Sequence, residues 1–160
     1  MKYLTDIKTL EDLKKAYHAW AVKLHPDLGG SVEEMQELNN EYDSLFSRVK
    51  NKHTNSKGET YEKETNEAPE NFRDIIDELL GMNHVTIEVI GCFVWVSGET
   101  RHYKEQLKAL GFKWHSKKTC WYLAPDWYRR YGKKAYSMND IRAMYGVRYE
   151  EETNLKEISA

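Results

Sequence analysis

Side chains able to do acid-base, nucleophilic or metal chemistry are spread along the 160-residue chain. The histidines and cysteines are His18, His25, His53, His84, His102, His115, Cys92 and Cys120. No nucleophile elbow, paired-carboxylate signature or phosphate-binding loop lies beside any of them. The two cysteines match no zinc-binding spacing, so we expect buried or idle thiols, with no disulfide and no metal site. The sequence therefore predicts a protein that is not an enzyme and has no cofactor.

One short motif, His25-Pro26-Asp27, places a titratable ring and a carboxylate on either side of a rigid proline. His25 has the chemistry of a catalytic base, but no nucleophile stands near it in a recognisable pattern. A bare tripeptide of this kind is usually a helix stop followed by a turn. Its meaning therefore depends on the elements that position it.

The segments on both sides of the motif have the apolar periodicity of amphipathic helices. The apolar positions recur every three or four residues: Leu10, Leu13, Tyr17, Trp20 and Leu24 before the motif, and Met35, Leu38, Tyr42, Leu45 and Val49 after it. Thr9 with Asp12, and Ser31 with Glu34, have the spacing of capping boxes. Pro26 must end the first helix near His25. Because the connection is short, we expect two antiparallel helices with the motif exposed at one end.

This arrangement resembles a J-domain, the module by which DnaJ-like co-chaperones act on DnaK-type ATPases. The match covers about residues 3–48, with Lys15-Ala16-Tyr17 at the family's distance before the motif and residues 35–42 in place of its third helix. Gly29-Gly30 makes the segment most similar to short viral and phage-type J-domains. The family's first helix is absent here or reduced to a contact through Tyr3, Leu4 and Ile7, because only eight residues precede the first periodic segment.

The resemblance implies that the chain docks on a DnaK-type chaperone and stimulates its ATP hydrolysis. The residues that it assigns to this contact lie in the loop and on one helix face: Lys14, Lys15, His18, Lys23, His25, Pro26 and Asp27. The family's basic face is weakened at His18 and Ala19. We therefore expect a modest attraction to an acidic partner surface, one that falls as salt is added.

Composition divides the chain into a helical hairpin (residues 1–49), a flexible linker (50–70), a small α+β domain (71–149) and an acidic tail (150–160). Residues 50–70 are polar, with Tyr61 as their only large apolar side chain, so ordering them buries too little surface to offset the entropy lost. Asn71 is then the expected cap of a short amphipathic helix that ends near Gly81. We expect this helix to dock on the following domain, with a free partner-binding helix as the alternative.

From His84 the apolar period becomes two, which is typical of strands. Two alternating runs meet at Gly91, a helix follows to Leu110, and two more short strands turn through residues 115–118. The predicted class is α+β, with a strand-strand-helix-strand-strand unit and flanking helices. The last helix is expected to begin at Ser137 and to end at Gly146.

Positive charge is concentrated in this second domain. The chain has a net charge of −2, but residues 84–149 carry 12 basic and 5 acidic side chains. Aromatic residues interleaved with basic ones suit single-stranded nucleic acid, because bases stack on rings while phosphates neutralise the cations. The candidates for binding nucleic acid or a protein client are Phe93, Trp95, Lys113, Trp114, Lys117, Lys118, Trp121, Tyr122, Arg129, Arg130, Lys133 and Lys134. The alternative is that a small domain uses its tryptophans as core and its lysines for solubility.

The segment from Leu107 to Tyr122 resembles a small domain found after short J-segments in proteins of bacterial mobile elements. Together the two resemblances predict a co-chaperone or adaptor whose C-terminal domain selects the client, such as a nucleoprotein. The alternative is a single-stranded nucleic-acid-binding protein in which the helical hairpin is only a scaffold. No apolar run is long enough to cross a membrane and no secretory leader is present, so we expect a cytoplasmic protein without a membrane partner.

Overall fold

The computed structural model describes residues 2–55, 57–125 and 137–144. Within these ranges the helices are α1 (Leu10–Leu24), α2 (Val32–Val49), α3 (Pro69–Leu80), α4 (Lys104–Ala109) and α5 (Met138–Met144), with short 3-10 turns η1 (Pro26–Leu28) and η2 (Arg101–Tyr103). The strands are β1 (Lys52–Thr54), β2 (Thr60–Glu62), β3 (Val85–Ile90), β4 (Phe93–Gly98), β5 (Lys113–His115) and β6 (Cys120–Leu123). The predicted mixture of helix and sheet is confirmed.

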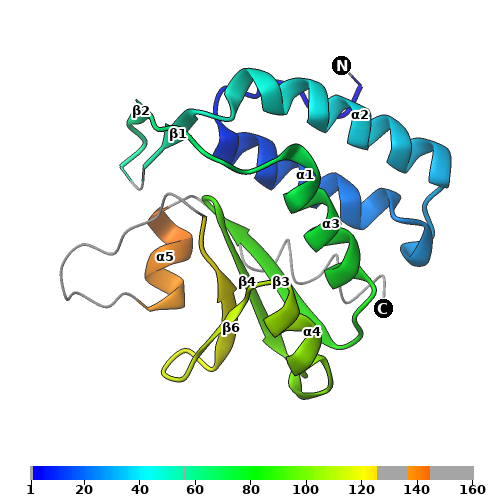
Figure 1. Cartoon of the computed structure of the whole chain (residues 1–160), viewed down its shortest axis with the longest axis vertical. Helices are drawn as coiled ribbons and strands as arrows, with labels where there is room; N and C mark the ends of the chain where they lie inside the picture. The colour runs from blue at the N-terminus through cyan, green and yellow to red at the C-terminus, as the bar shows by residue number, and fades with distance from the viewer. Residues whose placement is uncertain (1, 56, 126–136, 145–160) are drawn as a thin grey trace.

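Helices α1 and α2 pack side by side and are joined by η1 (Figure 1). Thr9 and Asp12 form a reciprocal capping box that begins α1, and the Ser31 hydroxyl accepts the Glu34 N–H at the start of α2. Pro26 cannot continue α1, so the chain leaves the helix at His25. The caps and the proline thus set where each helix meets the loop.

The two glycines after the loop have different roles. Gly29 adopts a φ of 95°, a left-handed conformation that glycine reaches without strain. A side chain on Gly30 would collide with the backbone of Leu24, so the chain returns close against the end of α1. This close return brings the start of α2 back beside α1.

The segment before α1 contains no helix between residues 2 and 9. Tyr3 and Leu4 are nevertheless buried against the helical pair. The Glu41 carboxylate of α2 accepts backbone N–H groups from Lys2, Tyr3 and Leu4 at 2.6, 3.0 and 2.9 Å. A non-helical segment that is hydrogen-bonded to α2 therefore stands where the resemblance would place a first helix.

Residues 50–70 were expected to be an unstructured linker, and this expectation is corrected. β1 and β2 form an antiparallel hairpin in which His53 pairs with Tyr61. The His53 side chain is fully buried, and its ring stacks on Tyr61 at a centroid distance of 5.3 Å. Composition missed the hairpin because its anchor is a buried polar residue and not an apolar one.

Helix α3 begins at Pro69, two residues before the expected cap. Pro69 suits the first helical position because its missing N–H needs no partner there. The Asn71 side chain accepts the Ala68 N–H at 3.0 Å from inside the first turn. The apolar face of α3 packs on α1 and α2, so this helix docks on the preceding helices and not only on the following domain.

Strands β3 to β6 form an antiparallel sheet in the order β3-β4-β6-β5. The register aligns Ile87 with Val96 and Val96 with Trp121, in a row that faces the helices. The adjacent row aligns Trp95 with Tyr122 on the opposite face, which α5 partly covers. The central strands of the sheet are thus covered on both faces, while the edge strand β5 is largely exposed.

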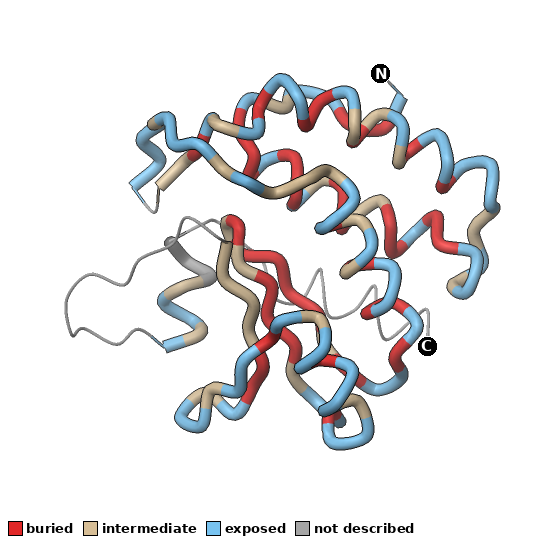
Figure 2. The backbone as a smooth tube through the Cα atoms, viewed as in Figure 1, coloured by how far each residue is buried: buried red, intermediate tan, exposed pale blue. Residues whose placement is uncertain are grey.

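One continuous cluster of buried side chains runs from Tyr3 to Trp121 and joins the helices to the sheet. Figure 2 colours the buried residues of the helices and strands red. At its centre the rings of Tyr17, Tyr42 and Phe72 lie within 5.9 Å of one another, centroid to centroid. The predicted boundary at residues 50–70 therefore does not separate two cores. Among the described residues, no helix has the length and apolar character needed to span a membrane.

Candidate functional site

The His25-Pro26-Asp27 loop lies at one end of the α1–α2 pair, and its ring is already engaged. His25 Nδ1 accepts the Asp27 N–H at 3.2 Å, so the ring proton lies on Nε2. Nε2 donates to Asp77 Oδ1 of α3 at 2.6 Å. His25 is only 5% exposed, whereas Pro26 and Asp27 are exposed. The loop thus presents its proline and its carboxylate, but not its imidazole.

The α1 face assigned to the partner is split between solvent and the interior. Lys15 and Lys23 are exposed, and Lys23 Nζ lies over the Trp20 ring at 5.0 Å. Lys14 and His18 are buried. This part of the face contacts α3, β1 and β3 instead of solvent.

Lys14 is a buried cation with a partly buried partner. Its Nζ lies 2.9 Å from Glu67 Oε2 and 5.1 Å from the centroid of Phe72. Burial lowers the pKa of Lys14, but the facing Cys92, Glu67 and Glu11 side chains outweigh it and raise the pKa overall. Lys14 therefore stays charged inside the fold and ties α1 to the segment that leads into α3.

On the α5 side of the sheet, the aromatic side chains that were expected to form a binding surface pack mostly in a hydrophobic cluster. Trp95 is 7% exposed and packs against Met138 and Ile141 of α5. Phe93 stacks on it at 5.9 Å with an interplanar angle of 15°, and Tyr122 lies at 5.6 Å. Trp95 is thus a core residue here, as the alternative reading of the tryptophans held.

The other two candidate tryptophans, Trp114 and Trp121, lie on the helix-facing side of the sheet. Trp121 is buried, and its Nε1 donates to Thr100 Oγ1 at 3.2 Å. Trp114, on the edge strand β5, is 48% exposed and contacts the Trp121 ring edge-on at 5.5 Å. Trp114 is therefore the aromatic candidate with a large accessible ring.

An open groove of about 820 Å³ runs beside Trp114. Its charged lining is mainly basic and comes from η2 and α4: Arg101, His102, Lys104 and Lys108, with Glu99 at one end. The spacing of three and four between Arg101, Lys104 and Lys108 was visible in the sequence. The sequence did not show that these basic residues lie next to Trp114, because this depends on the strand order that places β5 at the edge of the sheet.

The remaining basic candidates do not join this groove. Lys113 aligns with Tyr122 on the α5 side of the sheet, and Lys117 and Lys118 lie in the turn between β5 and β6. Arg129, Arg130, Lys133 and Lys134 fall outside the described residues, as does Gly146, the expected end of the last helix.

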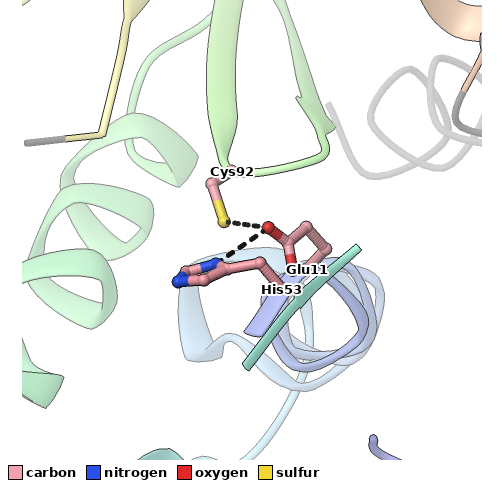
Figure 3. Close-up of side chains that lie close together, drawn as sticks. All are labelled: Glu11, His53 and Cys92. Carbon is pink, nitrogen blue, oxygen red and sulfur yellow. Dashed lines mark hydrogen bonds and ion pairs between the residues drawn. The ribbon is translucent and has the colours of Figure 1, made fainter. Parts of the chain in front are cut away.

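The sequence did not predict a further cluster of side chains that can bind a metal or do acid-base chemistry. Glu11 of α1, His53 of β1 and Cys92 of the β3–β4 turn meet in the interior (Figure 3). Glu11 Oε1 lies 3.1 Å from His53 Nδ1 and accepts the Cys92 thiol at 3.2 Å. Burial raises the pKa of Cys92 well above its usual range. The three residues are up to 81 positions apart, so no local spacing could have revealed them.

Comparison with protein-family models gives no match to the chain, and comparisons with curated proteins and with solved structures give none either.

Proposed function

We propose that the chain is a J-domain co-chaperone that stimulates ATP hydrolysis by a DnaK-type partner. The observation that supports this most directly is the His25-Pro26-Asp27 turn at the end of two capped, packed helices, with the proline and the carboxylate in solvent. Lys15 and Lys23 add exposed positive charge along the same helix. A charged acceptor at Asp27 suits charge-assisted hydrogen bonds to a cationic partner side chain.

In this proposal the docking face is partly covered by the chain itself. Asp77 holds the His25 ring, and Glu67 holds Lys14. Arg73 anchors α3 to Asp43 of α2 through two hydrogen bonds at 2.7 and 3.2 Å. Docking through the His25 ring requires the His25–Asp77 contact to open, so the form in which Asp77 covers the ring is the less active one.

A single-turnover ATPase assay with a DnaK-type chaperone tests the proposal on the full chain. Asp27→Asn should abolish stimulation and leave stability within about 0.5 kcal/mol, because the residue is exposed. Glu33→Gln is the matched control, since it removes an exposed carboxylate from the first turn of α2. Unaltered stimulation by the Asp27→Asn variant would contradict the co-chaperone proposal.

The groove beside Trp114 favours a second function, binding of single-stranded nucleic acid. An exposed indole ring next to Arg101, Lys104 and Lys108 combines a stacking surface with cations for phosphate. The accessible ring is Trp114 on the edge strand β5 and not Trp95, which lies on the inner strand β4 and on the opposite face of the sheet. In a co-chaperone the same groove would hold a nucleoprotein client.

Titration of labelled single-stranded DNA at two salt concentrations tests this function. Trp114→Ala should remove about 1 to 3 kcal/mol of binding without altering the salt slope. Lys104→Gln should reduce that slope by about 0.7, the value for one phosphate on a single strand. Lys15→Gln removes an equivalent exposed charge from α1 and serves as the control. Equal binding by the wild-type and Trp114→Ala proteins would exclude the groove.

A further inference from the structure

The side chains of Glu11, His53 and Cys92 form a compact buried donor set. One ligand atom from each, a carboxylate oxygen, a ring nitrogen and the thiol sulfur, lies within 4.8 Å of the other two. Figure 3 shows the three side chains converging from α1, β1 and the β3–β4 turn. All three are buried, with His53 completely so.

The tautomer of His53 determines what must lie between its Nδ1 atom and the Glu11 carboxylate. Nε2 lies 2.9 Å from the Lys63 carbonyl oxygen, which only accepts hydrogen bonds, so Nε2 carries a proton. Nδ1 then faces Glu11 Oε1 at 3.1 Å. A nitrogen lone pair and a carboxylate oxygen repel each other at this distance. A proton, carried by either group, or a metal ion must therefore lie between them.

The surroundings are those of a metal site. Metal-ligating histidines usually donate their other N–H to a carbonyl or a carboxylate, as His53 does to Lys63. The second Glu11 oxygen, Oε2, accepts the Thr54 N–H at 3.0 Å, which fixes the carboxylate. Both ligands are thus oriented by backbone groups of the β1–β2 hairpin.

The distances suit a tetrahedral ion. Bond lengths of about 2.0 to 2.3 Å to N, O and S place the ligand atoms of tetrahedral zinc roughly 3.3 to 3.8 Å apart. Glu11 Oε1 lies 3.1 Å from Nδ1 and 3.2 Å from Sγ, and all three ligand atoms lie within 4.8 Å of one another, so side-chain shifts of up to about 1 Å admit the ion. One thiolate, one imidazole and one carboxylate form a donor set that zinc prefers over magnesium or calcium.

We propose that Glu11, His53 and Cys92 form a binding site for a zinc-type divalent cation. On binding, the Cys92 thiol gives its proton to solvent and a metal–sulfur bond replaces the hydrogen bond to Glu11. The carboxylate and the thiolate neutralise the two charges of the ion, while Lys14 keeps its own partner, Glu67. The ion joins α1, the β1–β2 hairpin and the sheet, so its role is to hold these three elements together.

Cobalt and zinc titrations of the full, tag-free chain after chelator treatment test the site. Co²⁺ should bind with one equivalent and give a thiolate charge-transfer absorption that Zn²⁺ abolishes. Zn²⁺ should also raise the thermal midpoint of unfolding, since it binds the folded state selectively. Losing an outer-shell partner costs roughly 10- to 100-fold in metal affinity, so losing a ligand through His53→Gln should cost at least about 100-fold.

The two cysteines provide a matched pair of variants. Cys92→Ser should remove the charge-transfer absorption. Cys120→Ser should keep it, because Cys120 lies in the separate cluster with Ile90 and Trp95. X-ray absorption at the zinc edge of the wild-type protein, which needs no variant, should show one sulfur neighbour with nitrogen and oxygen. A folded wild-type chain that binds no Co²⁺, an absorption retained in Cys92→Ser, or a zinc shell without sulfur would each overturn the proposal.

Discussion

The Nε2 atom of His25 lies 2.6 Å from Oδ1 of Asp77 and so ties the loop to α3. The ring is buried, but the Asp77 side chain is 63% exposed. Solvent therefore screens the contact, and pairs of this kind contribute about 1 kcal/mol or less. A contact of that strength can open and release the His25 ring while Phe72 and Ile76 keep α3 packed on α1 and α2, so in the proposed co-chaperone Asp77 would act as a reversible cover of the loop.

If the chain is the proposed co-chaperone, removing the Asp77 carboxylate should strengthen its stimulation of ATP hydrolysis. If loss of the His25–Asp77 contact destabilises the covered form by about 1 kcal/mol, the concentration for half-maximal ATPase stimulation should fall by up to about fivefold. Asp77→Ala is compared with Asp74→Ala, which removes an exposed carboxylate one turn earlier on α3. An unchanged stimulation curve for Asp77→Ala would show that the contact does not control docking.

The pair of the buried Lys14 with the partly buried Glu67 should matter more for stability than for docking. Glu67→Gln leaves the Lys14 cation inside the fold without its counter-charge, which typically costs about 3 to 5 kcal/mol. Glu37→Gln breaks the pair of Glu37 with Lys2, whose side chains are more than half exposed, and should cost less than about 1 kcal/mol. Urea unfolding of both variants measures the difference. Equal losses would show that Glu67 does not compensate a buried charge.

Features fixed by local chemistry were predictable from the sequence. The capping box of Thr9 and Asp12, the stop at Pro26 and the mixture of helix and sheet all depend on residues close together in the chain. The periodicity also identified the side chains of α1 and α2 that form the core between them. Such features need no knowledge of how distant segments pack.

Features that depend on distant contacts were missed. The apolar stripe of α3 shows that one face is buried, but not that Phe72 meets Tyr17 and Tyr42. The β1–β2 hairpin is anchored by His53, a polar residue whose burial depends on Glu11 and Lys63. The exposure of Trp114 and the burial of Trp95 likewise depend on the order of the strands in the sheet. The alternation of apolar and polar residues along each strand does not reveal that order.

Glu41 should govern part of the acid stability. Burial by itself raises the pKa of this carboxyl, but the N–H groups of Leu4, Lys2 and Tyr3 outweigh it and lower the pKa overall. A lowered folded-state pKa contributes stability above the unfolded pKa, near 4.3, that is lost as the pH falls through the folded value. Glu41→Gln should cost about 1.5 kcal/mol at pH 7, the scale of a charge-assisted hydrogen bond. The deficit should shrink below pH 4, as followed by thermal melts. A deficit that is independent of pH would assign the loss to packing.

The helical hairpin should not fold well when it is cut away from the rest. A fragment of residues 1–50 lacks Phe72 and Ile76, which pack in the same cluster as Tyr17 and Tyr42. It also leaves Lys14 and Glu11 without Glu67 and His53. We expect a broad, weakly cooperative melt by circular dichroism, with a fragment of residues 1–81 that retains α3 as the comparison. A sharp melt of the shorter fragment would support the modular organisation suggested by composition.

Alanine at Trp95 and at Trp114 should have opposite effects on stability and binding. Trp95 is 7% exposed beneath α5, so its truncation should cost roughly 3 to 5 kcal/mol of unfolding free energy. Trp114 is about half exposed at the sheet edge, and its loss should cost far less because little buried surface disappears. If the groove binds single-stranded nucleic acid, Trp114→Ala should nevertheless be the variant that loses affinity. Urea unfolding and DNA titration of the two variants, made side by side, separate a core role from a binding role. A Trp95→Ala protein with wild-type stability would show that α5 does not cover this ring in solution.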